Sequence, residues 1–441
     1  MSFSNILEFE TSPRHYAVTP RSDFLSHKWQ DKNSIIRMEQ LEAILGDTVK
    51  PSILEEIRRG LNKVGMSIRI NPYVMELIDW QNAETDPIRR QFLPMLSEIE
   101  DDHPCLSVDS LDERNTSPVP NLVHRYPDKV LFLTTSACPV YCQFCTRSYA
   151  IGQDTITIKK DKVGSPKGWD AALEYIRSNP NIEDIVVSGG DIARLKPQNI
   201  RLLGNALLDI KHVRRIRFAT KALAIQPMKF LFDDDWFSAI AEVAHRGRAM
   251  FKSVYVHSHF NHPREVTPLV ERAMQRLFSE GIHVRNQTVL LRGVNDDKDI
   301  LADLTKKLGR INIQPYYIYA ADMVKSTEHY RVPVQEIQQY EREVRGTTAG
   351  FNTPLFIVDA PGGGGKRDVH SFEYRNDEYG ITGYRSPSID PDRMYYYFDP
   401  LRSLAPEISK EWTAPGGREA ILKRLGLEQE IIISEEQKVF V

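Results

Sequence analysis

Short apolar runs alternate with helical stretches between residues 129 and 359. Seven runs have the length and composition of buried strands: 129–135, 184–188, 214–219, 252–257, 283–290, 312–319 and 354–359. Between them, apolar residues recur at helical spacing, as in 168–177, 198–210, 234–246 and 266–280. Strands that alternate with helices form parallel sheets joined by crossover helices. The pattern predicts an α/β fold, a full or partial (β/α) TIM-type barrel, with functional groups at the carboxyl ends of its strands.

The extent of this pattern divides the chain into four regions. We expect an irregular N-terminal arm at 1–27, a helical N-terminal domain at 28–120, the barrel at 121–375 and a C-terminal extension at 376–441. Within the extension, a strand is expected at 393–398 and a short helix at 418–425. Residues 431–433 and 438–441 could form terminal strands, pairing either within the same domain or with another subunit.

Composition excludes several classes of protein. Apolar residues make up 41% and charged residues 27% of the 441 positions, as in an ordinary globular protein. The net charge of −3 provides no basic field for nucleic acid, and no apolar run approaches the roughly 20 residues of a membrane span. The N-terminus lacks the basic and apolar regions of a signal peptide. We therefore expect a cytoplasmic protein with no nucleic-acid or membrane partner.

Three cysteines follow the first apolar run: Cys138, Cys142 and Cys145, spaced C-x3-C-x2-C. Iron–sulfur clusters are held by Cys thiolates, usually four of them. Three closely spaced thiolates can hold three irons of a cubane and leave the fourth iron open to a small molecule. The spacing resembles the signature of the radical S-adenosylmethionine (SAM) enzymes, in which SAM chelates the open iron of a [4Fe–4S] cluster.

Other uses of these thiols fit the sequence less well. A structural zinc site needs a fourth ligand, and the nearest histidine, His124, precedes the strand rather than following it. Disulfides belong to oxidising compartments and even frameworks, whereas the fourth cysteine, Cys105, stands apart from the other three. We expect Cys105 to be a packed or surface thiol.

A glycine-rich segment follows the last apolar run. Four glycines at 362–365 lead to Lys366, and such a run lets a ligand approach the main chain closely. The segment is not a P-loop, because Arg367 follows the lysine where a P-loop has Ser or Thr. A plain turn is the common alternative. The position at a strand end on the functional face favours a lysine that carries pyridoxal 5′-phosphate (PLP) as a Schiff base.

Polar motifs also end other predicted strands. Ser188–Asp191 resembles the Gly-Gly-Glu-type motif with which radical SAM enzymes hold the amino group of SAM, although a strand followed by two glycines is also a common turn. His257, His259 and His262 follow another strand. Alternating histidines can bind a metal, but no carboxylate-bearing metal motif accompanies them, so hydrogen bonding to a cofactor is favoured.

Charged residues near the same strand ends suggest substrate contacts. Arg147 lies two residues after the last of the three cysteines, where its guanidinium could bind a carboxylate with two hydrogen bonds. Asp322 and Asp359 would form a paired anionic patch suited to a cationic side chain. Most strand-end Asp residues are only caps or turn formers.

Residues 29–387 resemble the lysine 2,3-aminomutase family of radical SAM, PLP-dependent enzymes. The matching segments are Asp86–Gln91, Thr116–Pro120, His124–Asp128, Cys145–Arg147, Ser188–Asp191, His259–Pro263, Leu290–Asp296, Pro315–Tyr319 and Val358–Lys366.

The resemblance implies a role for each matching residue. It implies a [4Fe–4S] cluster on Cys138, Cys142 and Cys145, and PLP on the catalytic Lys366 near Arg125 and Tyr126. SAM would contact Ser188, Gly189, Gly190, Asp191, His259 and Gln287. Arg147 would hold the α-carboxylate of the substrate, and Asp322 and Asp359 its distal amino group.

The implied reaction is an isomerisation that moves the α-amino group of a basic L-amino acid to C3. Reductive cleavage of SAM supplies the radical that takes hydrogen from C3, so the protein's work is mostly positioning. Lysine is the default substrate, because two carboxylates favour a cationic side chain. The alternatives are the same chemistry on arginine or another amino acid, and a radical SAM enzyme that acts on a protein-bound lysine.

The family also implies an electron donor, such as flavodoxin or ferredoxin, and a homo-oligomer, either a dimer or a tetramer. Two departures bear on these expectations. Ser148 and Tyr149 stand where the family commonly continues with basic residues. No Cys follows Cys145, whereas family members often carry a C-terminal Cys cluster for zinc at a subunit interface, so zinc and the tetramer are both in doubt.

Overall fold

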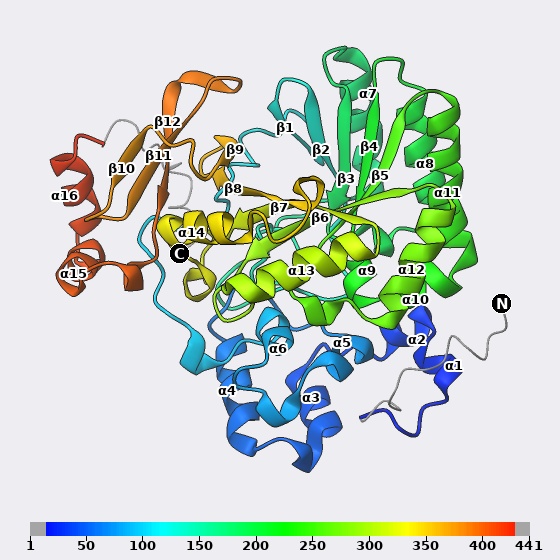
Figure 1. Ribbon diagram of the computed structural model, residues 1–441, viewed down its shortest axis with the longest axis horizontal. Helices are drawn as coiled ribbons and strands as arrows, with labels where there is room; N and C mark the ends of the chain where they lie inside the picture. Colours follow the sequence, from blue (N-terminus) through cyan, green and yellow to red (C-terminus); the bar gives the residue numbers. More distant parts are fainter. Residues whose placement is uncertain (1–14, 428–441) are drawn as a thin grey trace.

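One mixed sheet of nine strands forms the centre of the molecule (Figure 1). The computed structural model describes residues 15–427, so the strands expected at 431–433 and 438–441 lie outside the described residues. The sheet runs in chain order from β1 to β9. Its strands are β1 Leu122–Tyr126, β2 Lys129–Thr135, β3 Asp184–Gly189, β4 Arg215–Ala219, β5 Ser253–Ser258, β6 His283–Leu290, β7 Ile313–Ala320, β8 Leu355–Ala360 and β9 Gly365–Asp368. All seven predicted strands are confirmed, as β2 to β8.

Strands β2 to β8 are parallel, whereas β1 and β9 are antiparallel to their neighbours at the two edges. The crossover helices lie outside the sheet, as Figure 1 shows for α8, α11, α12 and α13. The helices of this part are α7 Trp169–Ser178, α8 Pro197–Leu208, α9 Ala222–Ile225, α10 Met228–Phe232, α11 Asp234–Ala249, α12 Pro268–Ser279, α13 Lys298–Arg310 and α14 Val334–Val344. The predicted α/β barrel is confirmed as nearly closed.

The two edges of the sheet meet through one hydrogen bond. The backbone N–H of Lys366 on β9 donates to the hydroxyl of Tyr126 on β1 over 2.8 Å. Antiparallel pairing of β8 with β9 sets Asp359 opposite Lys366. The turn between them uses Gly362, Gly363 and Gly365 at positive φ, a conformation that glycine adopts without steric cost.

Helices of the N-terminal region pack beneath the barrel, in blue in Figure 1, and share one hydrophobic core with it. They are α1 Arg21–Phe24, α2 His27–Lys32, α3 Met38–Leu45, α4 Pro51–Leu61, α5 Pro72–Leu77 and α6 Pro87–Phe92. The expectation of irregular chain up to residue 27 is wrong at residues 21–24. In this single turn Phe24 is buried against the rings of Tyr16 and Trp29, and four residues are too few to give a periodic signal in the sequence.

The C-terminal extension forms a small antiparallel sheet with two helices. Its elements are β10 Tyr374–Asn376, β11 Ile381–Ser386, β12 Asp390–Phe398, α15 Pro406–Thr413 and α16 Gly417–Arg424. The strand and helix predicted here are confirmed as β12 and α16. A second core joins this sheet to β7, β8 and α14.

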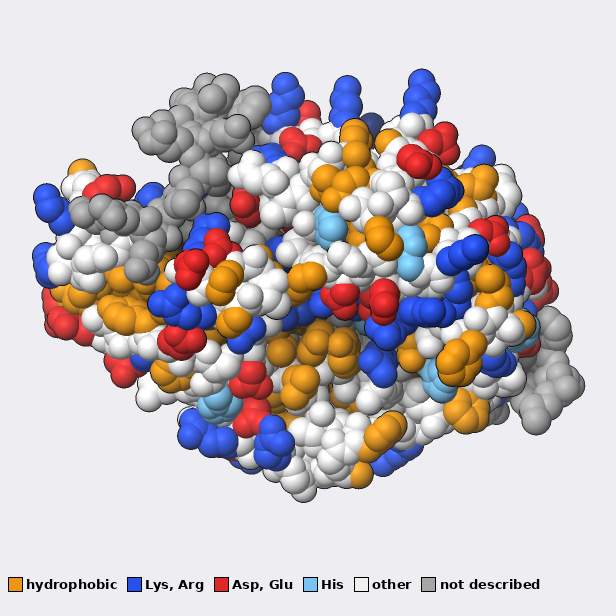
Figure 2. All heavy atoms as spheres, turned by 90° about the horizontal axis from the view of Figure 1, so that it is seen from above, with side chains coloured by type: hydrophobic (Ala, Val, Ile, Leu, Met, Phe, Trp, Pro, Cys, Tyr) orange, Lys and Arg blue, Asp and Glu red, His pale blue; other side chains and the backbone are white. Residues whose placement is uncertain are grey.

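Within the described part of the chain, no helix is long and apolar enough to cross a membrane. Basic and acidic side chains are interspersed on the face seen in Figure 2, with hydrophobic side chains between them. That face therefore carries no extended field of one sign.

Replacing Gly365 with Ala tests the closure of the two edges. Gly365 has φ +74°, and an added Cβ would lie 2.7 Å from the Tyr126 hydroxyl. Gly346→Ala is the matched control, because Gly346 has φ +87° and nothing within 4 Å of its added Cβ. Both variants bear the same backbone cost, but Gly365→Ala should lose about 1 to 3 kcal/mol more in the free energy of unfolding, measured with urea. Equal losses would show that the edges are not in tight contact.

Candidate active site

Two connected cavities occupy the interior of the barrel. The larger measures about 540 Å³ and the smaller about 280 Å³. Six of the residues that line both are Arg147, Ser188, Gln287, Tyr319, Asp359 and Lys366. Cys142 and Cys145 line the smaller cavity, whereas Arg125 and Tyr126 line the larger one. The barrel thus encloses one chamber with a cysteine end and an Arg125–Tyr126 end.

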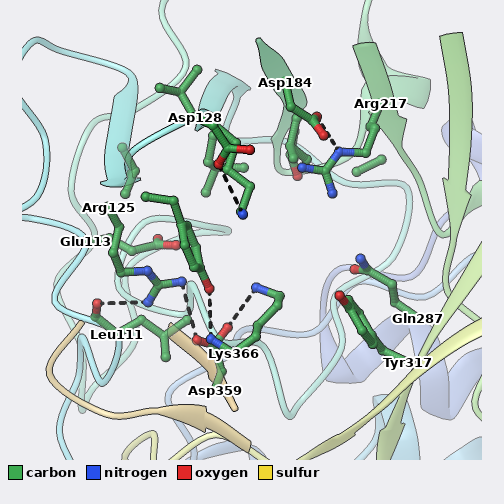
Figure 3. A pocket seen from close by; sticks show the side chains of 18 of the residues that line it. Leu111, Glu113, Arg125, Asp128, Asp184, Arg217, Gln287, Tyr317, Asp359 and Lys366 are labelled. Carbon is green, nitrogen blue, oxygen red and sulfur yellow. Dashed lines mark hydrogen bonds and ion pairs between the residues drawn. The ribbon is translucent and has the colours of Figure 1, made fainter. Parts of the chain in front are cut away.

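The partly exposed Lys366 and the buried Asp359 form an ion pair in the wall of this chamber (Figure 3). The lysine Nζ lies 3.0 Å from one Asp359 oxygen, and Arg125 lies 3.4 Å from the other. Burial alone would raise the pKa of Asp359, but Arg125 and Lys366 outweigh burial and lower it. Burial likewise opposes the charge of Lys366, yet Asp359 raises the pKa of that amine. Both groups are therefore ionised at neutral pH.

Asp322 lies just beyond the end of β7 and lines the smaller cavity with Asp359. One of its oxygens accepts a hydrogen bond from the Thr146 hydroxyl. Burial and the charge of Asp359 raise the pKa of Asp322 to about 7. Asp359 is therefore ionised, whereas Asp322 titrates near neutrality even with Lys366 and Arg125 nearby.

Arg147 reaches the chamber from the cysteine loop and is oriented by Glu113. Its Nε and Nη2 donate to the two Glu113 oxygens over 2.8 and 2.7 Å. The hydroxyl of Tyr149 donates to the same carboxylate over 2.8 Å. The Glu113 side chain is 3% exposed and the Arg147 side chain 22% exposed, so the ion pair is held inside while part of the guanidinium remains accessible. Glu113 neutralises Arg147 in part and fixes its direction.

Cys138, Cys142 and Cys145 lie together on the loop after β2. Burial raises the pKa of all three thiols, to about 12 for Cys142, and the nearby Asp191 and the other two thiols raise the pKa of Cys138 further. No three metal-binding side chains converge on a single point within residues 15–427. The three thiols are neighbours that do not share one metal-binding point, which fits a cubane, in which each thiolate binds a different iron.

The expected SAM contacts also line the smaller cavity: Ser188, Gly189, Gly190, Asp191, His259 and Gln287. A Cβ at Gly190 would lie 2.4 Å from the Ala137 carbonyl, so the cysteine loop itself requires glycine there. The Asp191 carboxylate accepts hydrogen bonds from the Thr220 hydroxyl and from the Ala193 and Lys221 amides. Because both carboxylate oxygens already accept hydrogen bonds from the protein, the backbone of this turn is the part left to contact a ligand in the cavity.

Two residues considered from sequence lie outside the chamber. His262 caps a short helical turn by accepting from the Arg264 amide, whereas His257 and His259 line the smaller cavity. Cys105 is packed against the C-terminal core, as expected, and burial raises its pKa to about 12.

The sequence analysis missed residues that complete the site. They are Glu113 and Thr146, which orient Arg147 and Asp322, and Lys221, whose Nζ donates to the His259 carbonyl over 2.9 Å. Glu113 lies in irregular chain with no periodic signal. Thr146 lies between Cys145 and Arg147, inside a motif that the sequence analysis used, so its position in the sequence could have indicated a place in the site.

No protein-family model matches the chain. An L-lysine 2,3-aminomutase of Acetoanaerobium sticklandii is 35% identical over 386 residues, 85% of this chain and 87% of the relative. That of Clostridium subterminale is 35% identical over 350 residues, 79% of this chain and 78% of the relative. A glutamate 2,3-aminomutase of Clostridioides difficile is 33% identical over 346 residues, 78% of this chain and 76% of the relative.

Among solved structures, a radical SAM methyltransferase from Sphaerobacter thermophilus matches at 18% identity with a TM-score of 0.36, over 54% of this chain and 68% of that chain. This similarity is too partial to bear on function. The sequence relatives, by contrast, span most of the chain, and the resemblance inferred from the motifs is confirmed. The chain belongs to the L-lysine 2,3-aminomutase family of radical SAM isomerases, which use a [4Fe–4S] cluster, SAM and PLP.

Proposed function

We propose that this enzyme moves the α-amino group of a basic L-amino acid, lysine foremost, to C3, with PLP on Lys366 and SAM at the cluster. One observation carries the proposal. Lys366, the Asp322–Asp359 pair and two of the three cysteines line a single cavity of about 280 Å³. A metabolite there would meet the amine, the carboxylates and the cluster ligands together.

The larger cavity fits PLP. Nζ of Lys366 lies 5.8 Å from the ring centre of Tyr126 and 5.6 Å from that of Tyr319, so aromatic surface flanks the amine. Lys129 and Arg217 line the same cavity and would face a phosphate. Bound PLP supplies an electron sink and a covalent tether for the migrating nitrogen. Asp359 and Arg125 fix the direction of the Lys366 side chain.

The cysteine end of the chamber fits the cluster and SAM. Together these groups supply the radical that removes hydrogen from the substrate. The chain contributes enclosure: Phe144 and Val289 line the same cavity as Cys142 and Cys145. Apolar walls keep water and other hydrogen donors from the reacting atoms. His259 and Gln287, which line this cavity, are the proposed side-chain contacts to SAM.

Two groups of opposite charge would orient the substrate. Arg147 would bind the α-carboxylate through the part of its guanidinium that Glu113 does not occupy. Asp322 and Asp359 would bind a distal ammonium, and its charge would complete the ionisation of Asp322. A glutamate side chain would place a third carboxylate beside this pair, which is costly in a buried site. We therefore propose lysine over glutamate, although one relative is a glutamate enzyme.

The remaining proposals follow from the chemistry of the family. SAM cleavage consumes one electron, so a donor such as flavodoxin or ferredoxin is proposed as a partner. We also propose a cytoplasmic location, where thiolates stay reduced, and a homo-oligomer.

Replacing Lys366 with Ala should abolish covalent attachment of PLP, because the variant lacks the amine that Asp359 directs into both cavities, whereas Lys129 lines only the larger one. The measurement is borohydride reduction of the PLP-loaded protein followed by peptide mass mapping. Wild-type protein should carry the label on Lys366, and Lys306→Ala, an exposed position on α13, should behave as wild type. Iron and sulfide contents should be unchanged in both variants. Label elsewhere in wild-type protein would refute the assignment.

The pH dependence of kcat/KM should report Asp322. Below pH 7 its carboxyl is neutral in the free enzyme and cannot pair with an ammonium, since its pKa is raised to about 7. With lysine as substrate, kcat/KM should therefore rise about tenfold per pH unit up to pH 7 and then level off. Asp322→Asn should be slower throughout and lack this rise. The same rise in the variant would assign it to another group.

A further inference from the structure

A third cavity lies beside the larger one, toward the amino ends of the strands. It measures about 320 Å³ and is lined by Asp184, Arg215, Arg217, Tyr255, His257, Arg285 and Tyr316. Asp184, Arg215, Arg217 and Tyr316 also line the larger cavity, so the two spaces adjoin. In Figure 3, Arg217 and Asp184 lie across the cavity from Lys366. No cysteine reaches this space.

The positive charges of this third cavity exceed the negative ones. Asp184 is its one carboxylate within the described residues, and it binds both Arg215, at 3.1 Å, and Arg217, at 2.7 Å. Arg285 forms no ion pair or side-chain hydrogen bond within residues 15–427. Its guanidinium instead lies over the rings of Tyr255 and Tyr316, at 5.0 and 5.1 Å. Three guanidinium groups against one carboxylate leave about two positive charges uncompensated.

His257 does not change this balance, because it is uncharged. Burial and the nearby charges of Arg217, Arg285 and Lys366 together lower its pKa to about 3. A neutral ring can still hydrogen-bond to a ligand, as it does to Gln287 at 3.3 Å.

Stacking on two aromatic rings holds a guanidinium flat and leaves the N–H groups along its edge free. Such an edge binds phosphate with two parallel hydrogen bonds. A dianion would match the two uncompensated charges, and about 320 Å³ admits a small oxyanion but no polymer.

We propose that this cavity is a phosphate-binding site in which Arg285 and Arg217 are the two guanidinium donors. The phosphate comes either from PLP, in which case the site rests on the proposed function and anchors the far end of the cofactor, or from free phosphate held beside PLP. Both sources present the same chemistry to Arg285.

Calorimetry with inorganic phosphate tests the site without reference to PLP. The full-length, cluster-reconstituted protein free of PLP should bind phosphate, and Arg285→Gln should bind it at least about tenfold more weakly. Arg310→Gln, which alters an exposed arginine at the end of α13, should bind as wild type. If Arg285→Gln fails to fold, Arg285→Lys replaces it and should bind with intermediate affinity, since it keeps the charge but loses the paired hydrogen bonds.

Loading with PLP separates the two sources. If the phosphate of PLP occupies the site, PLP-loaded protein no longer binds free phosphate, and Arg285→Gln weakens PLP much more than it weakens pyridoxal. If the phosphate is separate, PLP-loaded protein still binds it, and the binding still depends on Arg285. If the protein binds phosphate through Arg285 but does not bind PLP, the proposed function is refuted and the phosphate site stands. No phosphate binding by wild type, with equal PLP affinity in wild type and Arg285→Gln, overturns the site.

Discussion

The buried carboxylate of Asp359 is the constraint on which the rest of the site depends. An unpaired charge at 6% exposure would cost several kcal/mol, so its two cations must be held in place. The pairing of β8 with β9 positions Lys366 beside Asp359, and β1, at the other edge of the sheet, positions Arg125 there. The Arg125–Asp359 pair thus links β1 to β8 across the closure of the barrel, and the Lys366–Asp359 pair points the amine into the chamber.

The chamber divides its charges by position. A guanidinium held by Glu113 and a pair of carboxylates line the smaller cavity, whereas unbalanced guanidinium groups lie toward the amino ends of the strands. An amino acid with a cationic side chain matches the first arrangement, and a phosphate matches the second.

Much of this could be predicted from sequence, because parallel strands leave a strong and regular signal. Seven buried strands and three closely spaced cysteines put the chemistry at one end of a barrel. Strands β1 and β9 were missed, since both are short and are defined by pairing rather than by periodicity, and β9 is also polar. Glu113 lies in irregular chain, and Arg285 on β6 reads as one polar position of a strand. Their roles depend on which residues lie across the cavity, and that is a property of tertiary structure.

Tyr149 stands where the family commonly has a basic residue, and it still contributes to the site. Its hydroxyl donates to Glu113, so it supports Arg147 without adding a positive charge.

The most direct test of the account follows the nitrogen itself. Reconstituted protein, SAM and a reductant would be incubated anaerobically with L-lysine labelled with ¹⁵N at the α-amino group, and the product examined by NMR. The account predicts ¹⁵N bonded to C3. Cleavage of SAM with all ¹⁵N still on C2 would contradict it.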